Sequence, residues 1–234
     1  MKKKVIAVLL VLVLVAGAVS AKEVGVKVGA EFGWGFDVVN SKATGTVLGK
    51  SVTSTGKYKN NGFAGTLTAE YDFNEYFGLK ASFGLMFAGQ TKTSSKTGDS
   101  DAVTATRDEK AGTYIDAALD AKYTVNIADS LSLSALAGVE LVSGHVLKTD
   151  SDDINKDYKN LAFGLNAGVE FSYEVAKNIN LNLGVSAAWL FVNNAKALKE
   201  SGSSTVIGGK TLTSASYNAS SLYFRPYVGC TYAF

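Results

Sequence analysis

Charged side chains that could form a network of ion pairs recur at every second position through most of the chain. Nine acids and four bases follow this pattern on one face of the predicted strands. Because a charge that is buried without a partner is costly, we expect the four bases to bridge to acids on neighbouring strands and to plug the space between them. The alternative is a narrow cation-selective pathway. The predicted network consists of Arg225, Lys80, Lys122, Lys27, Glu31, Glu70, Asp116, Asp120, Glu140 and Glu170.

Residues that could support catalysis or metal binding do not form a complete motif. His145 is the only histidine, with Ser143 and Glu140 nearby. By alternation His145 and Ser143 face one way and Glu140 the other, which disfavours a catalytic triad at this rim. The acidic segment 150–157 could hold Ca²⁺ loosely, but it lacks the Gly and the terminal Glu of a calcium loop. No zinc pattern, phosphate-binding glycine loop or nucleophile elbow is present, so we predict no enzyme, cofactor or resident metal.

The first 21 residues have the pattern of a secretory signal peptide. Three lysines precede an apolar run from Val5 to Val15, and a stretch of small residues ends at Ala21, where we expect cleavage. Without the three lysines of this segment, 20 Lys and Arg remain against 21 Asp and Glu. The mature chain is therefore not basic, which removes the compositional case for a nucleic-acid partner. The single cysteine, Cys230, has no disulfide partner within the chain.

Apolar residues at every second position predict the strands that must carry these charges. One face of the strands is aliphatic, aromatic or small and includes 18 Phe, Tyr and Trp residues; the other carries the charges with many Gly, Ser and Thr. Each segment is long enough to cross a bilayer at a tilt, which takes about 9–11 residues. The eight predicted strands are approximately 24–38, 63–73, 77–89, 115–125, 131–141, 161–175, 179–191 and 222–234.

The volume of the aromatic side chains decides which face points outward. The interior of an eight-stranded barrel is only wide enough to be filled by side chains or to hold one small ligand, so the aromatic residues cannot all lie inside. The apolar face must then meet lipid, as in a closed transmembrane barrel. Aromatics gather near both ends of the strands, as expected for two interfacial girdles. The sequence therefore predicts an all-β fold, an eight-stranded antiparallel up-and-down transmembrane β-barrel that occupies residues 22–234.

Connections between the strands alternate between short turns and long polar segments. The long segments, about 39–62, 90–113, 142–160 and 192–221, are expected to be loops outside the cell, with the short turns in the periplasm. The first of them contains basic residues and no acid, and it is a candidate site for anionic polysaccharide or lipid phosphates. Its lysines are Lys42, Lys50, Lys57 and Lys59.

The last strand resembles the assembly signal of the small OmpA-like and OmpX-like outer-membrane barrels. Phe234 ends the chain, and Tyr232, Cys230 and Val228 precede it at steps of two. Pro226 departs from the pattern, because it removes a ladder donor, and we expect it near the loop end of the strand or at a bulge. No peptidoglycan-binding domain follows the barrel.

The resemblance implies a location in the bacterial outer membrane. The partners it implies are the lipids and lipopolysaccharide of that membrane and the assembly machinery during biogenesis. We expect a monomer with a structural or surface-recognition, adhesin-like role through its loops and with an extracellular ligand that the residues do not identify. The alternatives are a narrow pore and, less favoured, an enzyme at the rim that acts on lipid or peptide.

Overall fold

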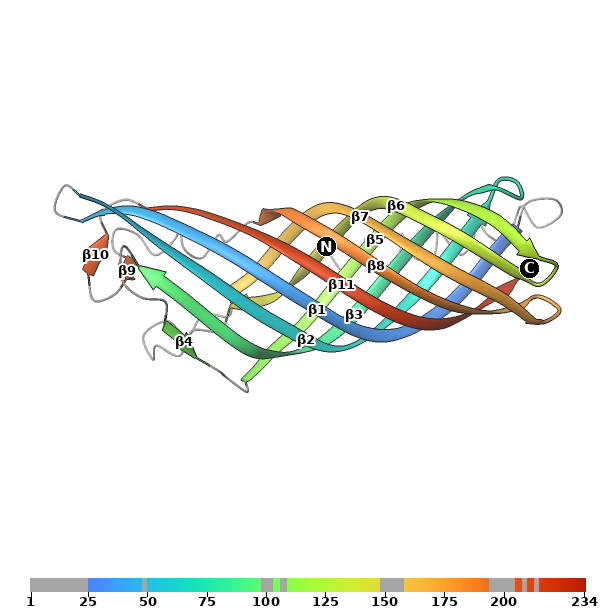
Figure 1. Ribbon diagram of the computed structural model, residues 1–234, viewed down its shortest axis with the longest axis horizontal. Helices are drawn as coiled ribbons and strands as arrows, with labels where there is room; N and C mark the ends of the chain where they lie inside the picture. Colours follow the sequence, from blue (N-terminus) through green and yellow to red (C-terminus); the bar gives the residue numbers. More distant parts are fainter. Residues whose placement is uncertain are drawn as a thin grey trace, which may run out of the picture.

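The computed structural model is a closed β-barrel with a sheet that continues beyond one of its ends (Figure 1). It describes residues 25–47, 50–97, 103–105, 109–147, 158–193, 205–207, 210–212 and 215–234. The predicted signal peptide with its cleavage site at Ala21 lies outside these ranges. No helix in the described part is long and apolar enough to cross a membrane.

Eight long strands form the wall of the barrel, and three short strands lie near its loop end. Each long strand pairs antiparallel with its neighbours in the order β2-β1-β11-β8-β7-β6-β5-β3, and pairing of β2 with β3 closes the ring. The predicted fold is therefore confirmed. The long strands are β1 Gly25–Val47, β2 Lys50–Asp72, β3 Phe77–Thr97, β5 Glu109–Ala128, β6 Leu131–Leu147, β7 Tyr158–Ala176, β8 Ile179–Asn193 and β11 Ala215–Ala233; the short strands are β4 Val103–Ala105, β9 Thr205–Ile207 and β10 Lys210–Leu212.

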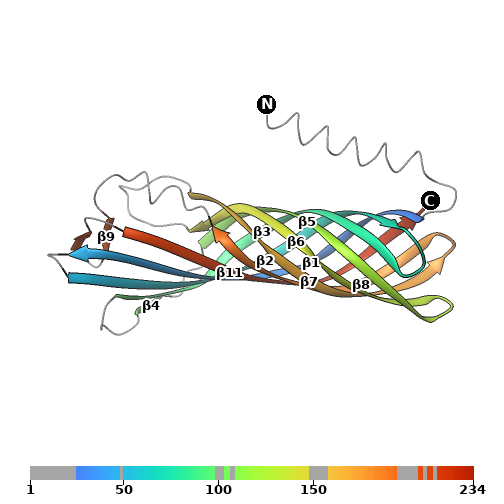
Figure 2. The same cartoon turned by 90° about the horizontal axis from the view of Figure 1, so that it is seen from above.

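Short turns join the strands at the end where both β1 begins and β11 ends (Figure 2). Between β2 and β3, the side-chain oxygen of Asn74 accepts hydrogen bonds from the backbone N–H groups of Tyr76 and Phe77, both at 2.9 Å. Between β7 and β8, Asn178 adopts a φ of 68°, which asparagine tolerates better than most residues. These tight connections fix the registers of the strand pairs that follow.

The outward face of the barrel is apolar over its whole circumference. Its large exposed side chains include Leu119, Leu165 and Leu183 on the middles of strands and Phe234 at the short-turn end. Aromatic neighbours pack against one another at both ends, with ring centroids 5.1 Å apart for Phe77 and Tyr123. A soluble protein rarely exposes so continuous an apolar surface. The aromatic residues at the loop end form the outer girdle: Trp34, Phe36, Phe63, Phe87, Phe163, Trp189, Phe191 and Phe224.

Strands β1, β2, β3 and β11 continue well past the outer girdle, where the sequence suggested loops (Figure 1). The pairing of β1 with β2 is unbroken to Val47–Lys50, so the first predicted loop, 39–62, is wrong over most of its length. Parts of the other three predicted loops also belong to strands β3, β5, β6, β7, β8 and β11. Beyond the girdle neither face of the sheet meets lipid, so the apolar alternation stops although the hydrogen-bonded ladder continues.

We call this extension the protruding sheet and define it as residues 39–47 of β1, 50–59 of β2, 91–97 of β3, β4 and 215–220 of β11. Strand β11 pairs with β1 as far as Ala215–Gly45, and β3 pairs with β2 as far as Thr97–Ser54. On the opposite side of the barrel, β6 ends at Leu147. The barrel is thus asymmetric, with a wall that stands higher on one side than on the other (Figure 2).

Pro226 interrupts one ladder of the barrel. The pairing of β1 with β11 stops at Gly33–Tyr227 and resumes at Phe36–Phe224, and Pro226 lies in this gap. Its pairing with β8 is kept on the other side. A proline has no N–H to donate, which explains the interruption. The residue lies one step inside Phe224 of the outer girdle, at a local irregularity of an otherwise continuous strand.

Candidate functional site

The lumen contains a buried network of ion pairs around Lys80 of β3. Its ammonium lies 2.6 Å from Glu31 Oε1 of β1, 2.5 Å from Glu170 Oε2 of β7 and 3.8 Å from Glu70 Oε1 of β2. The hydroxyl of Tyr227 donates a hydrogen bond of 2.9 Å to the same Glu170 oxygen. One cation thus joins three acids from three other strands and ties opposite walls of the barrel together.

A second set of ion pairs leads from Lys80 to the short-turn end. Lys122 lies 2.5 Å from Glu70 Oε2 and 2.9 Å from Asp72 Oδ1, and Lys27 lies 3.0 Å from Asp72 Oδ2. Because Glu70 also contacts Lys80, positive and negative groups alternate from the middle of the lumen to its mouth. The side chains become more exposed along this path, from 3% for Lys80 to 28% for Lys27.

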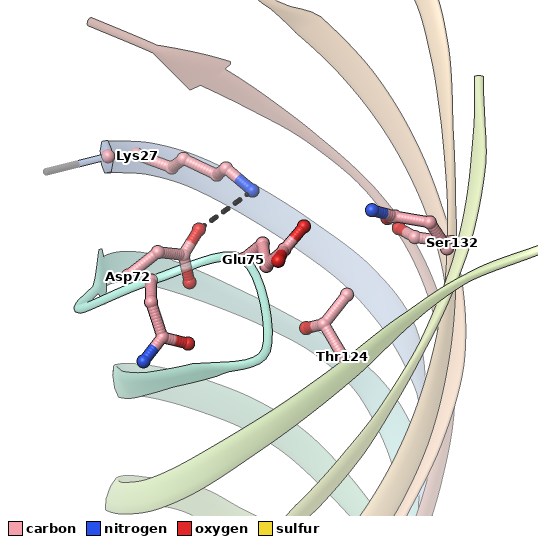
Figure 3. Close-up of a pocket in the computed structure, with 8 residues that line it drawn as sticks. Lys27, Asp72, Glu75, Thr124 and Ser132 are labelled. Atoms are coloured by element: carbon pink, nitrogen blue, oxygen red, sulfur yellow. Dashed lines mark ion pairs between the residues drawn. The ribbon is translucent and has the colours of Figure 1, made fainter. Parts of the chain in front are cut away.

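The mouth of the barrel at the short-turn end is a cavity of about 360 Å³ (Figure 3). The Lys27–Asp72 pair lies on one side of it, and Thr124 and Ser132 lie across from that pair (Figure 3). Hydroxyl and amide groups make up much of the wall, and Asp72 in this wall also pairs with Lys122, which is two residues from Thr124 on β5. The lining residues are Gly25, Lys27, Asp72, Asn74, Glu75, Thr124, Asn126 and Ser132.

Arg225 of β11 forms a separate contact group deeper in the lumen. Its Nη1 donates to Thr66 Oγ1 at 2.7 Å and lies 3.4 Å from Asp116 Oδ1. Asp120 and Glu140 are also buried, but within the described residues neither carboxylate forms a salt bridge. All four predicted bases therefore contact acids, whereas two of the six predicted acids are left without an ion pair. We call the whole set the ionic plug: Lys27, Lys80, Lys122, Arg225, Glu31, Glu70, Asp72, Asp116 and Glu170.

Above the ionic plug the lumen is filled by apolar side chains, which the sequence reasoning missed. Met86 and Val39 have no exposed surface, and Tyr114 and Tyr223 are almost fully buried beside them. The inward-facing residues are odd-numbered on β1 and even-numbered on β3. Extending this alternation beyond the charged residues identifies Val39 and Met86. This apolar cluster consists of Val39, Ala64, Met86, Tyr114, Val142, Ala162, Ala188, Leu190 and Tyr223.

Polar side chains lie among the outer residues of the apolar cluster, where Asp37 is in register with Tyr223. The side-chain amide of Asn60 donates to the Tyr114 hydroxyl at 2.8 Å, and Ser221 donates through its hydroxyl to Asp37.

Two inward-facing glycines make room for the large side chains of the lumen. A Cβ at Gly35 would collide with Met86.

The second of these glycines is Gly184, where a Cβ would collide with the ring of Tyr227. Beyond the cavity at its mouth, the described lumen is therefore occupied by the side chains of the ionic plug and of the apolar cluster.

Three of the four predicted anion-binding lysines share the outward face of the protruding sheet. The side chains of Lys42, Lys57 and Lys59 are exposed. In the ladder between β1 and β2, Lys57 faces Asn40, and Lys59 faces Val38. We call Lys42, Lys57 and Lys59 the basic face.

Other positively charged positions lie close to the basic face. The backbone of Lys92 in β3 is in register with Lys59. Lys50 lies at the start of β2, but its side chain is outside the described residues. Phe36 of β1 and Phe63 of β2, which belong to the outer girdle, face outward like the lysines of the basic face. The basic face therefore lies directly above the apolar belt.

The predicted assembly-signal residues line the outward face of β11. Phe234 is 63% exposed, and Cys230, Val228 and Tyr232 share its orientation. Tyr232 and Phe234 pack edge to face with ring centroids 5.1 Å apart. The Phe234 N–H donates to the backbone oxygen of Val26 at 3.0 Å, so the last residue still joins β11 to β1.

The side chains considered and disfavoured for catalysis or calcium binding lie mostly outside the described residues. His145 lies in β6, but its side chain is outside the described residues, as is the whole acidic segment 150–157. Ser143 is in β6, where it is only partly exposed. Among the described residues, no group of three or more His, Cys, Asp or Glu side chains could hold a metal ion.

Comparison with known proteins gives one family and several structures. Residues 6–210 match the family described as "Outer membrane protein beta-barrel domain". No curated protein sequence matches the chain. Among solved structures, OprG from Pseudomonas aeruginosa is 13% identical with a TM-score of 0.48 and covers 92% of this chain and 98% of its own.

Two further solved structures illustrate the range of similar barrels. Neisserial surface protein A is 13% identical with a TM-score of 0.45, over 86% of this chain and 97% of its own. The outer membrane protease OmpT from Escherichia coli is 9% identical with a TM-score of 0.37, over 89% of this chain and 97% of its own.

Proposed function

Because the chain belongs to the family of outer membrane protein beta-barrel domains, we propose that it acts as a monomeric structural and surface-recognition protein through its protruding sheet. Its location is the outer membrane. In the proposed orientation the short turns lie in the periplasm and the protruding sheet lies outside the cell. The ligand class is anionic, with phosphate or sulfate groups that bind the basic face.

The observation that carries this proposal is the position of the basic face. Lys42, Lys57 and Lys59 lie on a hydrogen-bonded sheet and not on a flexible loop, so their backbone spacing is fixed before a ligand binds. No acid occurs between residues 39 and 62. Clustered cations of one sign attract polyanions and are strengthened by preorganisation, because less conformational freedom is lost on binding.

The side chains that occupy the lumen favour a role at the outer surface and disfavour transport through the barrel. The ionic plug spans the inner part of the lumen, and the apolar cluster with the Asp37 and Asn60 contacts fills the outer part. An eight-stranded barrel has little interior volume beyond its own side chains. The proposal therefore gives the lumen a stabilising role and gives no residue a catalytic one.

The experiment compares anion binding by the wild-type protein and by a K42S/K57S/K59S variant, both in nanodiscs of neutral lipid. Heparin and vesicles that contain lipopolysaccharide are the two probes, because they separate a soluble polysaccharide from a membrane phosphate. We expect at least a tenfold loss of affinity for one of the probes in the variant. Added salt should weaken wild-type binding, because the attraction is electrostatic.

Two control variants make the result specific. Lys177 is an exposed lysine at the short-turn end, so K177S removes one charge far from the basic face and should bind like wild type. A K42S/K57S variant keeps Lys59 and its contacts. Full binding of both probes by the triple variant would reject the basic face as the anion site.

A further inference from the structure

The cavity at the short-turn end contains one base and one acid whose charges are only partly compensated by the rest of the protein. Lys27 reaches the cavity from β1, and Glu75 reaches it from the turn between β2 and β3. In Figure 3 the ends of both side chains are directed toward the same space, beside the Lys27–Asp72 ion pair. The cavity thus offers a positive and a negative group to one small molecule.

The Lys27 ammonium has hydrogen-bonding capacity beyond its pair with Asp72. An ammonium carries three N–H donors, and within the described residues this one pairs with a single acid, Asp72, at 3.0 Å. The other oxygen of Asp72 lies 2.9 Å from Lys122. Asp72 therefore shares its charge between two lysines, and the partly exposed Lys27 can pair with a second carboxylate that enters the cavity.

Glu75 is an acid without a cation in the part of the chain that the structure describes. Its side chain is exposed and accepts a hydrogen bond from the hydroxyl of Tyr76, the next residue of the same turn. No described lysine or arginine forms a salt bridge with it. An ammonium group of a ligand would supply the missing partner, because charge-assisted hydrogen bonds are stronger than neutral ones.

Hydrogen bonds fix the backbone positions that carry these two charges. The side-chain oxygen of Asn74 accepts hydrogen bonds from two backbone N–H groups of the turn that contains Glu75. The Thr124 N–H donates to the Tyr76 carbonyl at 2.7 Å, which ties this turn to β5. Lys27 lies in β1, which is paired on both sides. The site is therefore largely formed before a ligand binds, which reduces the conformational freedom lost on binding.

The opposite wall of the cavity is polar and uncharged. Thr124, Asn126 and Ser132 line it from β5 and β6. Thr124 Oγ1 lies 2.9 Å from the hydroxyl of Ser134, so hydrogen bonds continue from this wall into the lumen. The cavity volume of about 360 Å³ is at the lower end of the range for small-molecule pockets, about 300–1,000 Å³. The cavity therefore suits a compact polar molecule.

We propose that this cavity binds a compact zwitterion, an amino acid or a dipeptide, with the ligand carboxylate on Lys27 and the ligand ammonium on Glu75. A polar side chain of the ligand contacts the hydroxyl and amide groups of the opposite wall. A zwitterion compensates both charges at once, whereas a simple anion is repelled by Glu75 and a simple cation by Lys27. The site lies at the opposite end of the barrel from the basic face, so it does not depend on the proposed anion binding.

The test adds L-glutamine and the dipeptide alanyl-glutamine, in separate titrations, to the isotope-labelled mature protein in nanodiscs of neutral lipid. The backbone NMR signals of Gly25, Thr124, Asn126 and Ser132 report binding at the cavity. We expect at least one probe to shift these signals to saturation. A response to glutamine alone identifies a free amino acid as the ligand, and a response to the dipeptide alone identifies a peptide. No shift with either probe would overturn the proposal.

Two analogues of the probe that binds test the two charges separately. The N-acetylated form lacks the ammonium and the C-terminal amide form lacks the carboxylate, so each should bind the wild type at least tenfold more weakly. Glu75→Gln should abolish the preference over the acetylated form, and Lys27→Met the preference over the amide form. Equal binding of both analogues to the wild type would overturn the proposal, as would unchanged preferences in the two variants.

Control variants at the same rim separate the cavity from a general effect of charge. Asp129→Asn and Lys177→Ser each remove an exposed charge from another short turn and should bind the probe like wild type. A loss in either control equal to that in Glu75→Gln would contradict the assignment. A variant without residues 22–24 tests whether these residues occupy the cavity. Binding by this variant and not by the full mature chain would overturn the proposal.

Discussion

Lys80→Met is the most informative single substitution in the lumen, because one cation serves three acids. In the wild type, the Lys80 ammonium lies 2.6 Å from Glu31 and 2.5 Å from Glu170. Methionine keeps much of the side-chain volume and removes the charge. The substitution leaves both carboxylates buried without their cation, since their side chains are 3% and 2% exposed.

The expected cost follows from this burial. Removing one partner from a buried ion pair typically costs about 3–5 kcal/mol, and we expect Lys80→Met to lower the free energy of unfolding by that amount. Lys27→Met is the matched control, because Lys27 and Asp72 form a pair whose side chains are 28% and 19% exposed. An exposed pair contributes about 0–1 kcal/mol, so the control should change stability little.

A triple variant distinguishes loss of charge pairing from loss of packing. In K80M/E31Q/E170Q the two closest carboxylates are neutral and Glu70 keeps its ion pair with Lys122, so stability should return most of the way to wild type. Replacing a buried ion pair by neutral groups is often close to neutral in free energy.

Urea unfolding in liposomes, followed by tryptophan fluorescence, gives the free energies. Both tryptophans, Trp34 and Trp189, lie on the outward face, where unfolding transfers them from lipid to water. Equal losses in Lys80→Met and Lys27→Met would contradict the reasoning, and so would a triple variant no more stable than Lys80→Met.

Three further predictions test the faces and the packing of the barrel by the same unfolding assay. Leu119→Arg, on the lipid-facing side near mid-membrane, should cost about 2–4 kcal/mol, and Asp120→Asn on the lumen side much less; equal effects would mean a misassigned strand. Pro226→Val should stabilise the barrel by about 1 kcal/mol, because it restores one ladder donor; a loss of stability would show that the interruption has another cause. Gly184→Ala should cost about 1–3 kcal/mol, because its Cβ would collide with the Tyr227 ring; an unchanged midpoint would contradict the close approach.

The barrel could be predicted from the sequence because lipid imposes a strict rule on one face. The alternation that ends at Val38 on β1 and begins at Phe63 on β2 marks the part of each strand that meets the apolar belt. Outside the belt no face of a strand needs to be apolar, so the alternation is absent and the sequence predicts a loop where β1 and β2 are paired. Strand pairing there depends on backbone hydrogen bonds, which leave no pattern in hydrophobicity.

The ionic plug was predictable as a set of residues, but its pairing was not. The alternation of apolar and polar positions along each strand places Lys80 and Glu170 in the lumen. The contact between them, however, crosses the barrel from β3 to β7. Only the closed geometry brings these strands together. The same limitation explains the apolar cluster, because Met86 and Tyr223 come from strands that are not neighbours and meet only inside the barrel.

Ion conductance in a planar bilayer tests most directly the claim that the protein works through its outer surface and not through its lumen. The wild-type protein should give no stable single-channel current, and Arg225→Ala is the variant to compare, because Arg225 joins Thr66 and Asp116 inside the barrel. A stable wild-type conductance that changes with Arg225→Ala would contradict the account and favour a pore.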